Sequence, residues 1–259
     1  MYPELDEPIP RLDQYLNRLD ISRPKQCDLE YLDALILAHQ YAVPFENLDV
    51  HDEHLPISLA TEKIFEKVAV RRRGGYCFEL NALFARALEA LGYKVSPRLA
   101  RVVVDKDYGI PPLHRLTVVD LPDAKYVCDV GFGGAQPGFA LRIEDGRRQT
   151  ALDQTFRIDK IDDRWRISYH SQGDWEPTMV FTEQAAEDVD FIAPNFYCYA
   201  CAESMFVNRR IVNLRTREGH KSIDGDLFIV GENGKRTETP IKGDESLREI
   251  LLSHFGIEK

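Results

Sequence analysis

Residues 71–81 read Arg-Arg-Arg-Gly-Gly-Tyr-Cys-Phe-Glu-Leu-Asn, so a basic run and two glycines lead into Cys77. Beyond Cys77, apolar residues recur at the spacing of one helix face up to Gly92, a typical helix end. The first N–H groups of a helix lack internal partners and stabilise an anion such as a thiolate. Cys77 is therefore a candidate nucleophile, with Gly74 and Gly75 expected to leave room for a substrate carbonyl. A single cysteine on a helix is, however, more often a buried core residue.

Two β-branched segments downstream supply a base and an orienting carboxylate. Residues 114–120 and 125–131 are separated by a short polar connection, a pattern that predicts a hairpin. In such a pair the start of the first strand lies near the end of the second, so His114 and Asp129 are predicted neighbours. The hypothesis is a trio of Cys77, His114 and Asp129, in which the carboxylate binds one ring nitrogen and the other faces the sulfur.

Four segments taken together resemble the arylamine N-acetyltransferase family. They are Pro44–Leu48, Arg73–Cys77, His114–Leu116 and Asp129–Gly134. The bacterial N-hydroxyarylamine O-acetyltransferases are the branch that looks most similar. The resemblance implies a ping-pong acetyltransferase that uses acetyl-CoA as co-substrate and carries the acetyl group on Cys77. The expected acceptor is the nitrogen of an arylamine or arylhydrazine, or the oxygen of an N-hydroxyarylamine, and no metal or tightly bound cofactor is expected.

The resemblance also implies roles for residues around the trio. The backbone N–H groups of Cys77 and Leu113 are expected to form an oxyanion hole. Glu46 and Arg73 are expected to pair and to fix the loop that presents Cys77. Residues expected to bind the aromatic ring or the pantetheine arm are Phe45, Tyr76, Gly131, Phe132, Gly133 and Phe206. For Gly133 and Gly134, an alternative is that they only shape a corner of the barrel.

The order of sequence patterns predicts an α+β fold in three parts. Residues 1–92 read as a helical bundle that carries the nucleophile, 93–182 as a β-barrel that carries His and Asp, and 183–259 as an α/β lid. Asp28 is the expected N-cap of a helix. The resemblance adds a papain-like or transglutaminase-like Cys-His-Asp core. Strands are expected at 93–104, 114–120, 125–130, 139–143, 154–160, 164–170, 176–181, 205–216, 220–230 and 236–241, and later helices near 183–189, 195–202 and 244–255.

Composition excludes several other classes of protein. With 43 acidic and 33 basic residues the net charge is −10, which argues against nucleic acid as a partner. We find no apolar run long enough for a membrane span and no N-terminal signal pattern, so a cytoplasmic protein is expected. Five cysteines, an odd number, fit a reducing compartment. The Cys198-x-x-Cys201 spacing alone is weak evidence for a zinc or redox site.

Three alternatives remain open at this level. A Cys-His-Asp trio also suits a thiol hydrolase or a transglutaminase-like enzyme, which would act on a peptide or amide. An amide synthase of a biosynthetic pathway would keep the fold and change the substrate. A metal module using Cys77, His114, Cys128 and Asp129 is disfavoured, because adjacent strand residues point to opposite faces.

Overall fold

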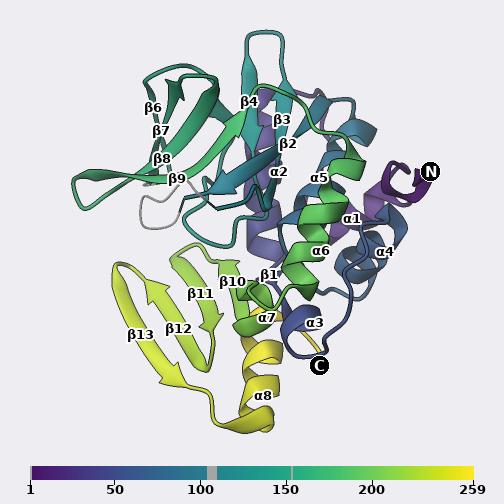
Figure 1. The fold of residues 1–259 in the computed structure, drawn as a ribbon, viewed down its shortest axis with the longest axis vertical. Helices are drawn as coiled ribbons and strands as arrows, with labels where there is room; N and C mark the ends of the chain where they lie inside the picture. The colour runs from purple at the N-terminus through teal and green to yellow at the C-terminus, as the bar shows by residue number, and fades with distance from the viewer. Residues whose placement is uncertain (1, 104–109, 153) are drawn as a thin grey trace.

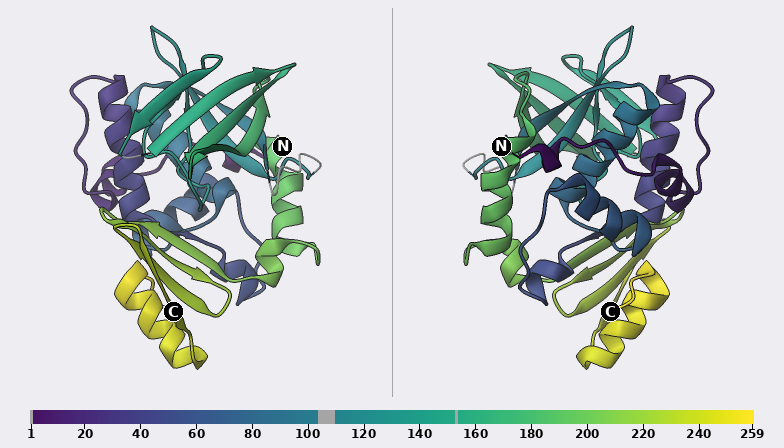
Figure 2. Two further views of the ribbon diagram at one scale, coloured as in Figure 1. Left: turned by 90° about the vertical axis from the view of Figure 1, so that its left-hand side faces the viewer. Right: turned by 90° about the vertical axis from the view of Figure 1, so that its right-hand side faces the viewer.

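The computed structural model describes residues 2–103, 110–152 and 154–259 of the 259-residue chain. A large antiparallel sheet and a smaller C-terminal sheet lie toward opposite ends of the longest dimension (Figure 1). Helices of the N-terminal part lie beside the large sheet, and the C-terminal helix lies against the smaller one (Figure 2). The architecture is a mixed α/β fold with a barrel-like sheet.

The N-terminal part is helical, as its apolar periodicity predicts. Its helices are α1 (Leu12–Arg18), α2 (Leu29–Ala42), α3 (Leu48–His51), α4 (Thr61–Phe65) and α5 (Cys77–Leu91), with a 3-10 turn at Pro3–Leu5 and a π-helical turn at Glu66–Val70. The side chain of Asp28 accepts the backbone N–H of Tyr31 at 2.9 Å, which confirms the predicted cap of α2. Gly92 has a φ of 105°, the left-handed conformation that ends α5.

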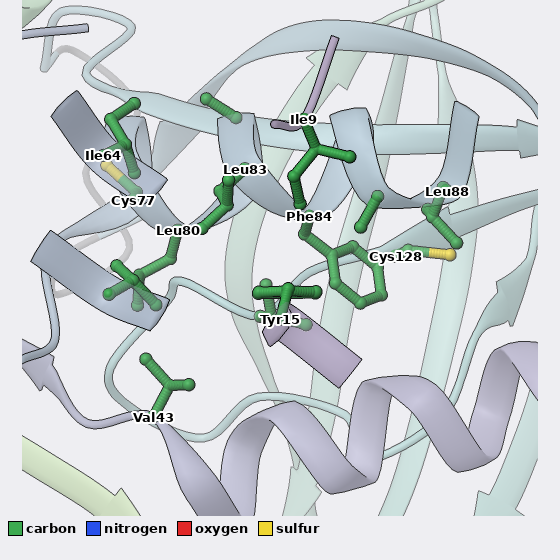
Figure 3. Packing of buried hydrophobic residues seen from close by; sticks show 14 of the residues in the cluster. Ile9, Tyr15, Val43, Ile64, Cys77, Leu80, Leu83, Phe84, Leu88 and Cys128 are labelled. Atoms are coloured by element: carbon green, nitrogen blue, oxygen red, sulfur yellow. The ribbon is translucent and has the colours of Figure 1, made fainter. Parts of the chain in front are cut away.

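The largest apolar core fixes α5 against its neighbours. Leu80, Phe84 and Leu88 project from one face of α5 and are buried (Figure 3). Tyr15 from α1 and Cys128 from the large sheet pack into the same cluster. Each such buried side chain contributes roughly 1.5–3 kcal/mol. The core therefore holds the helix that begins at Cys77 in one place relative to the sheet.

The large sheet has eight antiparallel strands in the order β5-β4-β3-β2-β9-β8-β7-β6. These strands are β2 (Lys94–Val102), β3 (His114–Asp120), β4 (Lys125–Cys128), β5 (Leu141–Arg142), β6 (Arg147–Ala151), β7 (Gln154–Ile161), β8 (Arg164–Ser171) and β9 (Asp174–Thr182). The edge strands β5 and β6 approach each other, since the Gln149 side chain bonds the N–H and carbonyl of Arg142 at 2.8 and 3.0 Å. The sheet is therefore a nearly closed barrel around a second apolar core that includes Leu116, Phe156 and Ile167.

The smaller sheet has the order β1-β10-β11-β12-β13. Its strands are β1 (Phe45–Glu46), β10 (Ile211–Arg215), β11 (Gly219–Asp224), β12 (Leu227–Glu232) and β13 (Lys235–Pro240), and the nearby helices are η3 (Asp188–Phe191), α6 (Ile192–Ala200), α7 (Met205–Asn208) and α8 (Gly243–Phe255). Strand β1 comes from the N-terminal part of the chain, pairs with β10 and bridges to Gly75. Helix α8 packs Leu251 and Phe255 onto this sheet.

Several predicted boundaries in the last third of the chain are wrong. Residues 205–216 were expected to be one strand, but Met205–Asn208 form a helix because the Ser204 side chain caps the N–H of Phe206. The single strand expected over 220–230 is two strands, with Gly225 in the turn at a φ of 61°. The helix expected near 183–189 is only the short turn η3.

Strand predictions for the barrel hold for most elements. Strand β6 was not predicted. Its sequence, Arg-Arg-Gln-Thr-Ala, is polar because the strand lies largely exposed at one edge of the sheet. The strand expected over 93–104 ends at Val102, and residue 104 lies outside the described residues. The division into segments at 92/93 and 182/183 stays a prediction.

Candidate active site

Cys77 is the first residue of α5, the place that the sequence predicts. The side chain of Glu79 accepts the N–H of Tyr76 at 3.1 Å, which fixes the residue just before the helix. The sulfur of Cys77 is largely buried and lies 3.7 Å from the carbonyl oxygen of Leu113. The positive end of α5 is therefore directed at a sulfur that the fold holds in one position.

The hairpin of β3 and β4 brings His114 and Asp129 together. Nε2 of His114 and Oδ2 of Asp129 are 2.6 Å apart, and both side chains are buried. Burial alone would lower the pKa of His114, but the charge and hydrogen bond of Asp129, with a further hydrogen bond from Cys77, raise it to about 10. His114 is therefore protonated at neutral pH, and its second ring nitrogen is left for the sulfur of Cys77.

A cavity of about 420 Å³ opens at Cys77 and His114. Most of its wall is apolar, and Glu203 and Ser204 are polar residues among its lining. Five of the residues expected to contact substrate line it, together with the residue expected to complete the oxyanion hole. They are Phe45, Gly131, Phe132, Gly133, Phe206 and Leu113. Phe132 stands edge-on to the His114 ring, with centroids 5.7 Å apart. The cavity has the size and polarity of a small-molecule site.

A profile of the N-acetyltransferase family matches residues 28–258, and an arylamine N-acetyltransferase from Escherichia coli is 32% identical over 96% of this chain and 89% of its own length. The chain belongs to the arylamine N-acetyltransferase family. An arylamine N-acetyltransferase / N-hydroxyarylamine O-acetyltransferase from Salmonella typhimurium is also 32% identical, over 95% of this chain and 88% of its own. These findings confirm the resemblance stated from the sequence.

The fold of this family member agrees with a solved relative. The structure of Mycobacterium marinum arylamine N-acetyltransferase in complex with CoA superimposes with a TM-score of 0.89 and 28% identity, covering 95% of this chain and 93% of that one. The similarity extends over the helical part, the barrel and the C-terminal sheet alike.

The structure corrects two interpretations made for the loop before Cys77. Tyr76 does not line the cavity. Its side chain is fully buried, donates to Asn195, and packs edge-on against Phe206 with ring centroids 5.4 Å apart. Gly74 is needed for packing rather than for access to the sulfur, since a Cβ there would lie 1.9 Å from the carbonyl oxygen of Pro44. The loop therefore packs closely against Pro44. Tyr76 contacts the cavity-lining residue Phe206 from the side of the core.

Gly131 and Gly133 also have packing reasons. A Cβ at Gly131 would lie 2.9 Å from Cα of Cys77, and one at Gly133 would lie 2.7 Å from the Phe45 ring. Gly133 has a φ of 72° as well, which favours glycine. Both residues border the cavity, and their contact with substrate stays a prediction. For Gly133, the contact with Phe45 and the positive φ support the alternative of a structural role.

A network of largely buried charged side chains packs against the loop that precedes Cys77. The expected pair of Glu46 and Arg73 is present, with 2.8 Å between Oε1 and Nη2. The rest of the network was not expected from the sequence: Lys67 lies 2.8 Å from both Asp49 and Glu79, and Arg73 also pairs with Asp49. Burial raises the pKa of Glu79, although Lys67 opposes this. The only sequence signal was the position of Glu79 in the first turn of α5, typical of a capping residue.

Two amide side chains that the sequence analysis missed hold Asp129. Asn81 donates to its Oδ1 at 2.9 Å, and Gln40 donates to its backbone carbonyl at 3.1 Å. Asn81 could have been found from its spacing, because it lies one helical turn after Cys77 on the same helix. The contact of Gln40 depends on tertiary packing of α2 and has no local signal.

The remaining cysteines form no disulfide among the described residues. Cys198 lines the same cavity as Cys77, while Cys201 lies close to Glu203 and does not pair with Cys198. Within residues 2–103, 110–152 and 154–259, no group of His, Cys, Asp or Glu side chains could hold a metal ion. In the same part of the chain, no helix has the length and apolarity needed to span a membrane.

Proposed function

We propose that the protein transfers the acetyl group of acetyl-CoA to an arylamine nitrogen, and to the oxygen of N-hydroxyarylamines, through an acetyl-Cys77 intermediate. The single observation that carries this proposal is that Cys77 and His114 line an apolar cavity, with His114 bonded to the buried Asp129, in a chain of this family. The relatives named for both acceptors and for CoA support the choice of substrates.

In the proposed resting state the proton of Cys77 resides on His114. The rise in the pKa of His114 from 6.5 to about 10 corresponds to roughly 5 kcal/mol in favour of imidazolium. A buried imidazolium beside the sulfur, together with the N-terminus of α5, favours the thiolate. Asp129 holds the ring by one nitrogen, so the other nitrogen stays directed at the sulfur.

In the first half-reaction the Cys77 thiolate attacks the thioester carbonyl of acetyl-CoA. The backbone N–H groups of Cys77 and Leu113 are the proposed donors to the oxyanion, and CoA leaves as a thiolate that takes the proton of His114. In the second half-reaction the amine attacks acetyl-Cys77, neutral His114 accepts the amine proton, and the Cys77 thiolate leaves. Arylamines suit this step because they are neutral at physiological pH and keep a free lone pair.

The cavity favours a flat apolar acceptor. Phe45, Phe132 and Phe206 contribute rings to its lining, with Phe45 and Phe206 in contact at a centroid distance of 6.2 Å. Part of this wall comes from α6, α7 and β10, and this supports the proposal that residues 183–259 act as a lid over the barrel. Segments 1–92 and 93–182 would then supply the nucleophile and the His–Asp pair.

Intact-protein mass spectrometry after brief exposure to acetyl-CoA tests the proposal. The wild-type protein should gain the mass of one acetyl group, and Cys77→Ala should gain none. Cys198→Ala is the matched control, because it removes the other thiol of the same cavity and should still gain the group. Adding an arylamine should discharge the adduct with formation of the acetamide. An acetyl group on Cys77→Ala, or an adduct discharged equally fast by water, would contradict the proposed function.

A further inference from the structure

Asn81 makes a set of contacts that joins the nucleophile helix α5 to strand β3 and to the segment that follows β4. Its side chain is fully buried on α5, four residues after Cys77. Nδ2 donates to the Arg115 carbonyl at 2.6 Å and to Oδ1 of Asp129 at 2.9 Å, and Oδ1 accepts the N–H of Val130 at 2.9 Å. Asn81 is thus bonded to the residue after His114 and to the residue after Asp129.

The two oxygens of the Asp129 carboxylate have different partners. Oδ2 lies 2.6 Å from Nε2 of His114, while Oδ1 accepts the side chain of Asn81 and the N–H of Gly131, each at 2.9 Å. A carboxylate can rotate about its Cβ–Cγ bond. Two hydrogen bonds to Oδ1 stop this rotation and thereby fix the position of Oδ2 relative to His114. Asn81 is the side-chain donor of this pair, and Gly131 supplies the backbone donor.

We propose that Asn81 is a positioning residue: it fixes the plane of the Asp129 carboxylate and thereby holds the His114 ring at the correct distance and orientation from Cys77. This inference rests on the proposed function of the trio and adds a fourth member to it. Because Asn81 is on the same helix as Cys77, one rigid element carries both the nucleophile and the group that sets the orienting carboxylate. A displacement of α5 would then move both together.

A purely structural role for Asn81 predicts a different result. If Asn81 only ties α5 to the barrel, its loss lowers stability and leaves the reactivity of Cys77 unchanged. If it positions Asp129, its loss also changes how well His114 activates the sulfur. Supporting groups of this kind typically affect activity by roughly 10- to 100-fold.

The test compares two replacements of Asn81 with a matched control. Asn81→Asp is nearly isosteric, keeps the acceptor for Val130 and removes both donated hydrogen bonds, while Asn81→Ser removes the carboxylate-facing amide without adding charge. The control is Asn47→Ala, since Asn47 is also buried and bonds three backbone groups, those of Phe206, Arg209 and Ile211. Each variant is first checked for folding by circular dichroism and thermal unfolding.

The readout is the pH dependence of Cys77 alkylation by iodoacetamide, which requires no acetyl donor and therefore does not depend on the proposed acyl transfer. We expect both Asn81 variants to react roughly 10- to 100-fold more slowly at pH 7 and to regain speed only at alkaline pH. Asn47→Ala should keep the wild-type alkylation profile even if its unfolding temperature falls by as much as that of the Asn81 variants. Wild-type alkylation profiles in either folded Asn81 variant would overturn the proposal, and so would an equal loss in Asn47→Ala.

Discussion

Replacing Asp129 by Asn should inactivate Cys77 at neutral pH with little change in shape. Burial lowers the pKa of His114, but the charge and hydrogen bond of Asp129, with smaller contributions from Cys77, raise it from 6.5 to about 10. That rise corresponds to roughly 5 kcal/mol, and each 1.36 kcal/mol is a factor of ten in an equilibrium. An amide at this position would in addition donate to Nε2 of His114, which places the ring proton on the nitrogen that faces the sulfur. We therefore expect alkylation of Cys77 at pH 7 to slow by at least ~100-fold.

The assay for Asp129→Asn is the second-order rate of iodoacetamide alkylation between pH 5 and 10. The wild-type rate should be high already at pH 6, whereas the variant should reach it only near the pKa of an ordinary thiol, about 8.5. Asp120→Asn removes a half-buried carboxylate that pairs with Lys94 at the far end of β3, and it should behave as wild type. Rapid alkylation of folded Asp129→Asn at pH 6 would refute the role of Asp129 in charging His114.

Stability offers an independent check on the same pair. The folded-state pKa of His114 is raised above its unfolded value of 6.5, so its contribution to folding is fully present below pH 6.5 and is lost as the pH rises through about 10. In a Cys77→Ala background, where no thiol proton can pass to His114, the stability difference caused by Asp129→Asn should therefore be largest near pH 6 and should shrink toward pH 10. A difference in free energy of unfolding that is constant over this range would contradict the assigned charge on His114.

Two further predictions concern buried ionisable groups outside the trio. Lys67→Met should lower the free energy of unfolding by about 3–5 kcal/mol in urea titrations, because it leaves the buried Glu79 carboxylate without its cation and leaves half-buried Asp49 with Arg73 alone. Arg71→Met, which removes an exposed charge, should change it by less than about 0.5 kcal/mol; equal effects would exclude the network as a support. Burial and the charge of Arg18 lower the pKa of His39 to about 3, so wild type should lose roughly 1.4 kcal/mol per pH unit between pH 6 and 4 through this group. His39→Gln should show a shallower acid dependence of the unfolding temperature, and identical slopes would count against a buried neutral His39.

The trio could be predicted from sequence because each member has a strong local signal. Cys77 follows a glycine pair at a helix start, and His114 and Asp129 lie at positions that hairpin geometry brings together. The family resemblance then assigned chemistry to them. The supporting residues Lys67, Asp49 and Gln40 have no such signal, since their contacts depend on how α2, α3 and the π-helical turn pack against α5.

Errors in the predicted elements have physical causes as well. Residues 205–208 contain the apolar run Met-Phe-Val, which favours a strand, yet one hydroxyl cap from Ser204 is enough to start a short helix. Tyr76 was expected to be one of the residues that bind the aromatic ring of the substrate. Its position before the first helical turn points the ring into the core instead, where Asn195 accepts its hydroxyl.

The two-residue strand β1 makes the segment that presents Cys77 depend on the C-terminal sheet. Phe45 and Glu46 find their backbone partners in β10, more than 160 positions later, while Phe45 also bridges to Gly75 beside the nucleophile. A fragment ending at residue 182 would leave this strand unpaired and would loosen the segment that presents Cys77. The protein should consequently denature in a single cooperative transition, and limited proteolysis of the C-terminal sheet should abolish thiol reactivity even though no member of the trio is cut.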